Sequence, residues 1–257
     1  MHPASSVIFF TTASGAGFGI MSWLCVAILM GHYTLTPHTI VMGVIGLVLA
    51  GAGLLSSTLH LGNPQRAWRA VSQWRTSWLS REGILAVLTC LNFAGILALY
   101  LTSGVVLPWM AGSCLVLSLL TIIATAMIYA QIKPVPRWHT KLTVLCYLGF
   151  STSTGMAVIA SVSPTRYHVY LAFGGLVLAW VFKLLWWQRA SRTSLSHDGS
   201  TTATATGLTG FSSVKLFEKP HMTQNYLMTE MVFEIGRKHA ARLRQIALLA
   251  GGLLPFI

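Results

Sequence analysis

Long apolar stretches dominate this chain, and polar residues gather in the gaps between them. Six stretches approach the roughly 20 residues that a helix needs to cross a bilayer: residues 8–30, 39–61, 83–102, 105–132, 142–162 and 167–188. Backbone groups in lipid have no water to bond with, so each stretch must be helical. The pattern therefore predicts an all-α fold, a polytopic transmembrane helix bundle.

A seventh apolar run, residues 246–257, is too short to cross and is either half a helix or the start of a longer one. The N-terminal run lacks a basic segment and a convincing cleavage site, so we interpret it as a membrane helix and not a removable signal peptide. We divide the chain into a six-span bundle (1–189), a cytoplasmic loop (190–244) and the start of a seventh span (245–257). The loop begins with a flexible Ser/Thr/Gly-rich tract and ends with an amphipathic segment.

Composition supports the membrane interpretation, because 54% of residues are hydrophobic, 9% are charged and the mean hydropathy is +0.67. Of the 17 Lys and Arg residues, four lie between the second and third spans, three near the gap between the fourth and fifth, and eight after the sixth. The net charge of +12 thus reports topology and not nucleic-acid binding. The bias predicts a protein of the bacterial inner membrane with its N-terminus and basic loops in the cytoplasm.

Small residues inside the spans are expected to serve packing. None of the four cysteines forms a CxxC pair, which argues against a disulfide framework or an iron–sulfur site in this chain. Glycines cluster in the first two spans, where they let helices approach closely. These glycines are Gly15, Gly17, Gly19, Gly43, Gly46, Gly51 and Gly53.

Ionisable residues that could carry chemistry flank the gap between the second and third spans. His60 ends one span and Glu82 opens the next, so a short hairpin would bring both to the cytoplasmic boundary. An imidazole can hydrogen-bond a quinone carbonyl and exchange the proton that accompanies electron transfer, and Glu82 could relay that proton toward water. Arg66 and Arg81 would stabilise negative charge on a reduced quinone, or hold lipid phosphates.

Other interpretations of the same residues stay open. Interfacial His, Arg and Trp are ordinary membrane anchors, and this explanation suits Trp68, Trp74 and Trp78 individually. Topology determinants or contacts to a partner are the best individual explanation for Arg66, Arg69, Arg75 and Arg81. The residues predicted to dock a partner are Arg69, Arg75 and Arg137. A transporter would require ionisable residues near the bilayer midplane, where the spans offer little beyond Asn92 and, near one end, Lys183.

Haem b is a further alternative, because it needs two axial histidines that face each other across a bundle. We expect three histidines on the cytoplasmic side (His139, His221 and His239) and three on the other (His32, His38 and His168). No pair lies clearly within facing spans. A purely structural tether would leave His60 and Glu82 dispensable.

Three segments resemble the membrane anchor family of dimethyl sulfoxide reductase type molybdoenzymes. They are HPASSVIFFTTASGAGFGI near the start, LLSSTLHLGNPQRAWRAVSQWRTSWLSREG in the middle and GRKHAARLRQIALL near the end. The resemblance runs along nearly the whole chain, and the central segment is its most specific part. It implies a subunit without substrate chemistry of its own, which exchanges electrons between membrane quinone (menaquinone or ubiquinone) and an iron–sulfur partner. Molybdopterin and the iron–sulfur clusters would belong only to the partner subunits.

The resemblance also implies site residues, because the family's HLG histidine and the glutamate that opens the next helix are linked to quinol binding. They match His60 and Glu82. Two departures stand out: the family is expected to have eight spans, and the dimethyl sulfoxide reductase anchor presents its partners outside the cytoplasm. The charge bias here favours the related sulfite dehydrogenase anchor, in which sulfite oxidation would reduce quinone, although the chain leaves the direction of electron flow open.

Overall fold

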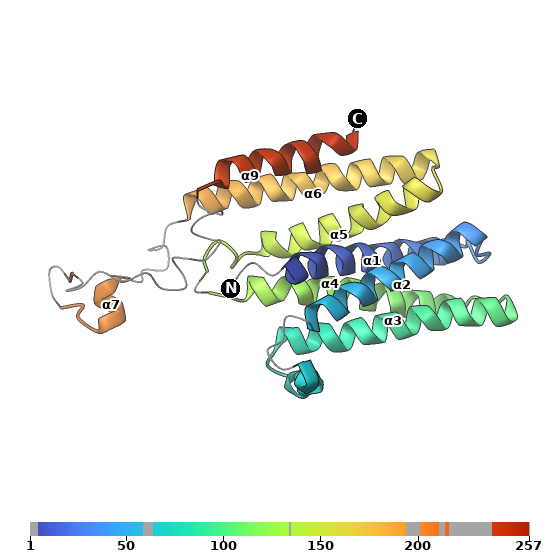
Figure 1. Cartoon of the computed structure of the whole chain (residues 1–257), viewed down its shortest axis with the longest axis horizontal. Coiled ribbons are helices and arrows are strands. Elements are labelled where there is room, and N and C mark those ends of the chain that lie inside the picture. Colours follow the sequence, from blue (N-terminus) through green and yellow to red (C-terminus); the bar gives the residue numbers. More distant parts are fainter. Residues whose placement is uncertain are drawn as a thin grey trace.

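Six long helices form the bulk of the computed structural model (Figure 1), which describes residues 5–58, 64–133, 135–193, 201–210, 214–215 and 238–256. In chain order they are α1 (Ser5–Leu29), α2 (Pro37–Thr58), α3 (Trp78–Ser103), α4 (Pro108–Ala130), α5 (Lys141–Val162) and α6 (Arg166–Arg192). All six are long and apolar enough to cross a membrane. The predicted all-α bundle is confirmed, and the chain is a multi-pass membrane protein.

Capping residues, a glycine and a proline mark the ends of several helices. The side chains of Ser77, Thr140 and Thr165 accept hydrogen bonds from backbone N–H groups in the first turns of α3, α5 and α6. Gly104 ends α3 in the left-handed conformation, with φ of 68°. Pro108 then opens α4, where its missing N–H costs nothing. These residues explain why α3 begins five residues before its apolar run and why α4 begins at Pro108, inside its run.

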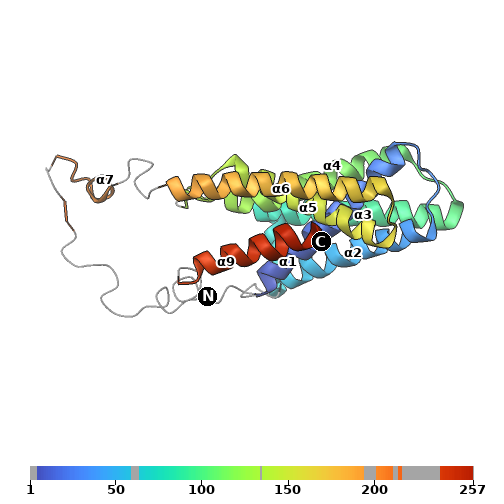
Figure 2. The ribbon, with the colours of Figure 1, turned by 90° about the horizontal axis from the view of Figure 1, so that it is seen from above.

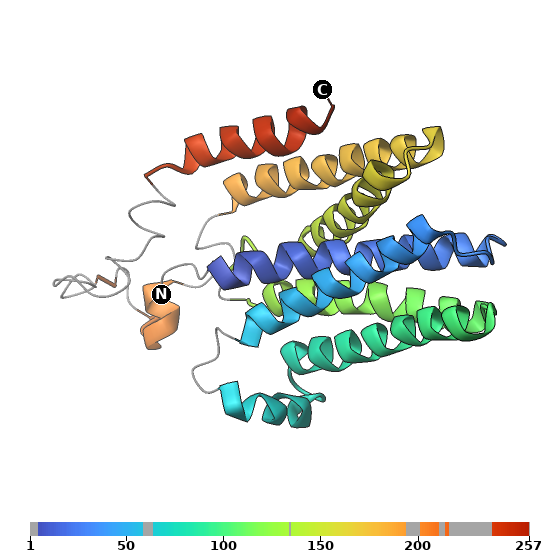
Figure 3. The ribbon, with the colours of Figure 1, turned by 45° about the vertical axis from the view of Figure 1, so that its right-hand side comes forward.

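Helix α1 is the centre of the bundle and packs against α2, α4 and α5 (Figures 1 and 3). In its most apolar window 67% of residues are buried, against 6% for α6, which lies at the periphery against α5. The buried core includes Phe18, Ile20 and Met21 of α1 together with Phe93 of α3 and Ile122 of α4. The first span is therefore the element around which the others are arranged.

Close helix contacts explain most of the glycine cluster. A Cβ at Gly17 would lie 2.5 Å from the carbonyl oxygen of Gly46 in α2, and a Cβ at Gly19 would overlap that of Ser151 in α5. A Cβ at Gly155 of α5 would likewise overlap the backbone of Gly19. Gly51, by contrast, has open space around it. At these glycines the backbone of α1 contacts the backbones of α2 and α5 directly, as predicted for these small residues.

The C-terminal stretch is helical from Ala240 to Phe256, as α9 (Ala240–Ile246), η3 (Ala247–Leu253) and η4 (Leu254–Phe256). It lies along α6 (Figure 2), where the Trp180 indole donates a 2.8 Å hydrogen bond to the Gly251 carbonyl. It thus begins before residue 246, where the apolar run starts. Of the predicted loop 190–244, most of the flexible tract and of the amphipathic segment lies outside the described residues.

One end of the bundle, which we call the basic end, holds the starts of α1, α3 and α5 and the ends of α2, α4 and α6. The short helix η1 (Pro64–Gln73), which follows α2 and precedes α3 in the chain, lies beside α3 at this end (Figure 1). The described arginines of the basic end include Arg69, Arg75, Arg81, Arg137 and Arg189. The cytoplasmic location of the basic end remains a prediction from charge.

Candidate functional site

Glu82 is the one acidic residue in the described part of the chain, and it lies inside the bundle. It occupies the second turn of α3 and only 3% of it is exposed. Its carboxyl group faces α4, where the Thr125 hydroxyl donates a hydrogen bond to Oε1. Because α3 begins at Trp78, Glu82 is one turn deeper than the sequence analysis placed it. The carboxyl is therefore enclosed by protein at the basic end and does not open into the loop.

The hydrogen-bond pattern at Thr125 bears on where a proton can reside. This hydroxyl has one hydrogen but two acceptors in reach: Glu82 Oε1 and, at 3.1 Å, the carbonyl oxygen of Thr121. The hydroxyl can donate to one of them at a time, so a proton on the carboxyl would let both contacts be hydrogen bonds. The Glu82–Thr125 pair is therefore suited to gaining and releasing a proton between two helices.

Arg81, the neighbour of Glu82 in sequence, points the other way and holds the preceding loop. Its guanidinium donates to the carbonyl oxygens of Trp74 at 2.9 Å and Arg75 at 2.7 Å. It also stacks 4.4 Å over the Trp78 ring. The structure therefore separates Arg81 from Glu82, because successive helical residues face about 100° apart.

We expect Arg81→Gln to loosen this loop, since hydrogen bonds to a charged donor contribute about 1.5–3 kcal/mol when shielded and less in water. Amide hydrogen exchange in residues 64–77 should become roughly tenfold faster by this reasoning. Arg75→Gln is the matched control, because Arg75 stacks on Trp74 at 5.4 Å without closing the loop. Equal amide protection of residues 64–77 in the Arg81 and Arg75 variants would contradict the role of Arg81 in holding this loop.

The remaining predicted residues of this region lie on or near η1. Arg69 is exposed and stacks 5.6 Å over Trp68, and Arg75 is exposed beside Trp74. These side chains point to solvent or headgroups and do not meet Glu82. The backbone of Arg66 belongs to η1, but its side chain lies outside the described residues, as does all of His60.

The loop between α4 and α5 is held at the same end by Arg189 of α6. Its guanidinium donates to the carbonyl oxygens of Pro136 at 3.0 Å and His139 at 3.3 Å. His139 in turn contacts the carbonyl oxygen of Ala130 through Nδ1 at 2.7 Å. Arg137, predicted as a docking residue, is exposed on this loop. The loop is therefore held by contacts to α4 and α6, and none of these contacts involves the exposed Arg137.

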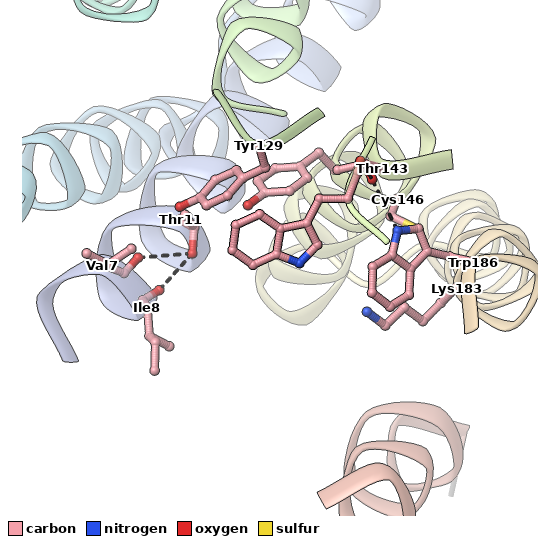
Figure 4. Close-up of a pocket in the computed structure, with 10 residues that line it drawn as sticks. Val7, Ile8, Thr11, Tyr129, Thr143, Cys146, Lys183 and Trp186 are labelled. Atoms are coloured by element: carbon pink, nitrogen blue, oxygen red, sulfur yellow. Dashed lines mark hydrogen bonds between the residues drawn. The ribbon is translucent and has the colours of Figure 1, made fainter. Parts of the chain in front are cut away.

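Aromatic and polar residues next to this loop enclose a cavity of about 330 Å³ (Figure 4). Thr11 and Tyr129 lie on one side of it, and Lys183 and Trp186 on the other. Tyr129 stacks on Tyr147 with 5.8 Å between ring centroids and meets Trp138 edge-on at 5.6 Å. A second cavity of about 400 Å³ adjoins the first and shares Thr11, Cys146, Tyr147 and Lys183 with it.

A small void has Thr125, the partner of Glu82, in its wall. It has a volume of about 10 Å³, close to the ~10–15 Å³ that one water needs, and it is also lined by Tyr147 and Thr11 among others. Tyr147 and Thr11 also line both larger cavities. The void therefore has Thr125 in its wall together with two residues of the cavity walls.

Sequence reasoning missed the cavity residues and gave Lys183 no role. Helix α6 continues to Arg192, past the loop between α4 and α5, so Lys183 lies level with the ends of these two helices, near Tyr129 and Thr143. An ionisable residue inside an apolar run is the signal that could have identified this site. Nothing in the sequence pattern marks Tyr129, Tyr147 or Thr125.

The described histidines give haem b no pair of ligands inside the bundle. His32 and His139 lie in loops, His38 and His168 in the first turns of α2 and α6, and His239 directly before α9. Within the residues that the structure describes, no group of three or more His, Cys, Asp or Glu side chains could hold a metal ion. All four cysteines carry free thiols.

Comparison with known proteins agrees with this architecture. The profile of the DMSO reductase anchor subunit (DmsC) family matches residues 1–233. The chain belongs to the DMSO reductase anchor subunit family. The anchor is also 35% identical, over 241 residues, to a subunit of sulfite dehydrogenase from Allochromatium vinosum, with 84% of this chain and 73% of that protein covered.

No solved structure gave a significant match to the anchor. Membership of the family establishes the role of a membrane anchor in a complex with catalytic and electron-transfer subunits. The basic end of the anchor holds Glu82, the loop that Arg81 fixes and the cavity beside Lys183.

Proposed function

We propose that the anchor passes electrons between the iron–sulfur clusters of a partner subunit and membrane quinone, at a site that includes His60 and Glu82. In this proposal quinone is reduced while a molybdopterin subunit oxidises sulfite. The similarity to a subunit of sulfite dehydrogenase supports this direction over quinol oxidation. The same site residues would serve either direction, because proton transfer is reversible.

The enclosed Glu82 carboxyl is the observation that carries the proposal. A quinone supplies a two-electron, two-proton couple when bound, so its site needs a group that holds and releases protons away from bulk water. Glu82 and Thr125 form such a group between α3 and α4. Helix α2 ends at Thr58, two residues before His60 in the sequence, and this end of α2 is at the basic end, where Glu82 lies.

Partner docking is proposed for the exposed face of the same end. Arg69, Arg75 and Arg137 are exposed and carry no described ion pair that would compete with a partner. An iron–sulfur subunit with an acidic surface would be attracted to them, and the attraction should weaken with salt. Docking here would bring the partner's clusters to the end where Glu82 is buried.

His60→Ala tests the proposal in the purified complex. We expect sulfite-dependent quinone reduction to fall about 10- to 100-fold, the range for losing one hydrogen bond at a reacting group. Sulfite-dependent reduction of a soluble dye by the partner subunits should stay unchanged, which controls for assembly. His139→Ala, at the same end but bonded to Ala130, is the matched variant. Unchanged quinone reduction in the His60 variant would argue for a structural tether.

A further inference from the structure

Lys183 is the charged side chain that the proposed function leaves without a task. It lies in the wall of both larger cavities, between α1, α5 and α6. Its Nζ lies 4.5 Å from the centroid of the Trp186 ring and 5.4 Å from that of Trp187. No described oxygen accepts a hydrogen bond from it, and the described carboxyl, Glu82, is bonded to Thr125 on α4 instead. An ammonium group held only by ring faces retains donors for a ligand.

We propose that the quinone ring binds in this cavity and that Lys183 donates a hydrogen bond to one of its carbonyl oxygens. The inference rests on the proposed function and assigns a binding residue and a location to it. Volumes of about 330 and 400 Å³ fall within the ~300–1,000 Å³ of small-molecule sites. The walls also suit a flat ring, because Tyr129, Tyr147 and Trp186 present aromatic surfaces.

The lining of the cavity argues for quinone and against a phospholipid headgroup. Lipid phosphates are recognised by clusters of Lys and Arg, whereas Lys183 is the one Lys or Arg among the residues that line the two cavities. A quinone ring is uncharged and still offers carbonyl acceptors to a single ammonium group. Val7 and Ile8 of α1 form an apolar edge of the cavity, which suits an isoprenoid tail.

The cavity also shares a wall residue with the void beside the partner of Glu82. Glu82 is hydrogen-bonded to the Thr125 hydroxyl, Thr125 and Tyr147 both line the small void, and Tyr147 also lines the cavity. Reduction of one quinone to quinol takes two electrons from the partner's clusters and two protons from the aqueous phase at the basic end. Glu82, Thr125 and Tyr147 would deliver one of these protons, and Lys183 would orient the oxygen at the other side of the ring. Lys183 is then a binding and positioning residue.

Photolabelling of the intact complex with an azido-ubiquinone, followed by peptide mapping, tests the location directly. We expect label on peptides of α1, α5 and α6 in the wild-type complex. Lys183→Met should reduce this labelling and raise the KM for the quinone by about tenfold, the effect of one charged hydrogen bond. Lys141→Met is the matched control, since Lys141 is an exposed lysine at the start of α5.

Tyr147→Phe keeps the ring and its packing, and therefore separates binding from proton delivery. It should retain the label while quinone-linked turnover falls, and a complex that keeps full turnover would remove Tyr147 from the proton route. Unchanged label and KM in Lys183→Met, together with loss of turnover in a Glu82 variant, would overturn the cavity assignment and leave the proposed function intact. Absence of quinone reduction by the wild-type complex would overturn both.

Native mass spectrometry of the same samples distinguishes quinone from lipid. Copurifying quinone should be retained by the wild type and lost from Lys183→Met. If the variant instead loses a phospholipid while quinone content and labelling stay unchanged, the cavity is a lipid site and the inference is wrong. Equal thermal stability of both complexes in detergent confirms that the comparison concerns folded protein.

Discussion

Glu82→Gln is expected to lower quinone-linked turnover by about 10²- to 10⁴-fold, the usual contribution of a positioned acid or base. Gln keeps an oxygen that can accept from the Thr125 hydroxyl, so the contact between α3 and α4 survives. It cannot gain or lose a proton, and the route from the basic end to the cavity is interrupted. Stopped-flow or steady-state assays of quinone reduction by the purified complex measure the effect. Dye reduction by the partner subunits checks that the complex is assembled.

Thr89→Val provides the matched control for this prediction. Thr89 lies two turns deeper on the same face of α3 and contacts Thr121 of α4 at 3.2 Å, so the variant also removes a polar contact between these helices. It removes no proton carrier, and turnover should stay within about threefold of wild type. Glu82→Gln and Thr89→Val with similar turnover would show that helix packing, and not proton transfer, is what Glu82 provides.

Gly155→Ala is expected to destabilise the bundle strongly. The added Cβ would overlap the Gly19 carbonyl carbon and lie 2.5 Å from the Ile20 nitrogen, and these backbone atoms cannot rotate away. Overpacking costs about 1–3 kcal/mol where side chains can adjust, so rigid backbone should place this variant at or above that range. A lower midpoint of thermal unfolding in detergent and poorer complex yield are the measurable results.

Gly51→Ala controls for the effect of alanine itself. Gly51 lies in α2, and an added methyl group there would have nothing within 4 Å, so its substitution should be neutral or slightly stabilising. If Gly155→Ala unfolds at the same temperature as Gly51→Ala, α1 and α5 are not held at the distance that their glycines indicate. Since Tyr147 is on α5 and Thr11 on α1, that separation also sets the width of the cavity.

The fold followed from the sequence in most respects, because hydrophobicity and length alone determine which segments cross a bilayer. The six apolar runs correspond to the six long helices, with differences of a few residues at their ends. Those differences have local causes, such as the Ser77 cap that begins α3 before its apolar run. Depth along a helix was less certain, as the position of Glu82 shows.

The candidate site was only half predictable. His60 and Glu82 could be selected because ionisable residues at a span boundary are costly without a role. Arg81 could not be assigned correctly from its position in the chain, since its guanidinium reaches back to Trp74 and Arg75 instead of toward Glu82. Which way a side chain points depends on the rotation of its helix, and apolar runs that face lipid and protein alike carry little of that information.

By itself, then, the sequence determined that this protein is a multi-pass anchor whose basic residues gather at the ends of its spans, and it predicts His60 and Glu82 for the quinone site. Tertiary structure decided what Glu82 contacts and that Lys183, Tyr129 and Tyr147 share one cavity. The physical reason is that crossing a membrane is a property of each segment, whereas a cavity arises from residues of α1, α4, α5 and α6 that are far apart in the chain. Their meeting depends on the packing of whole helices around α1.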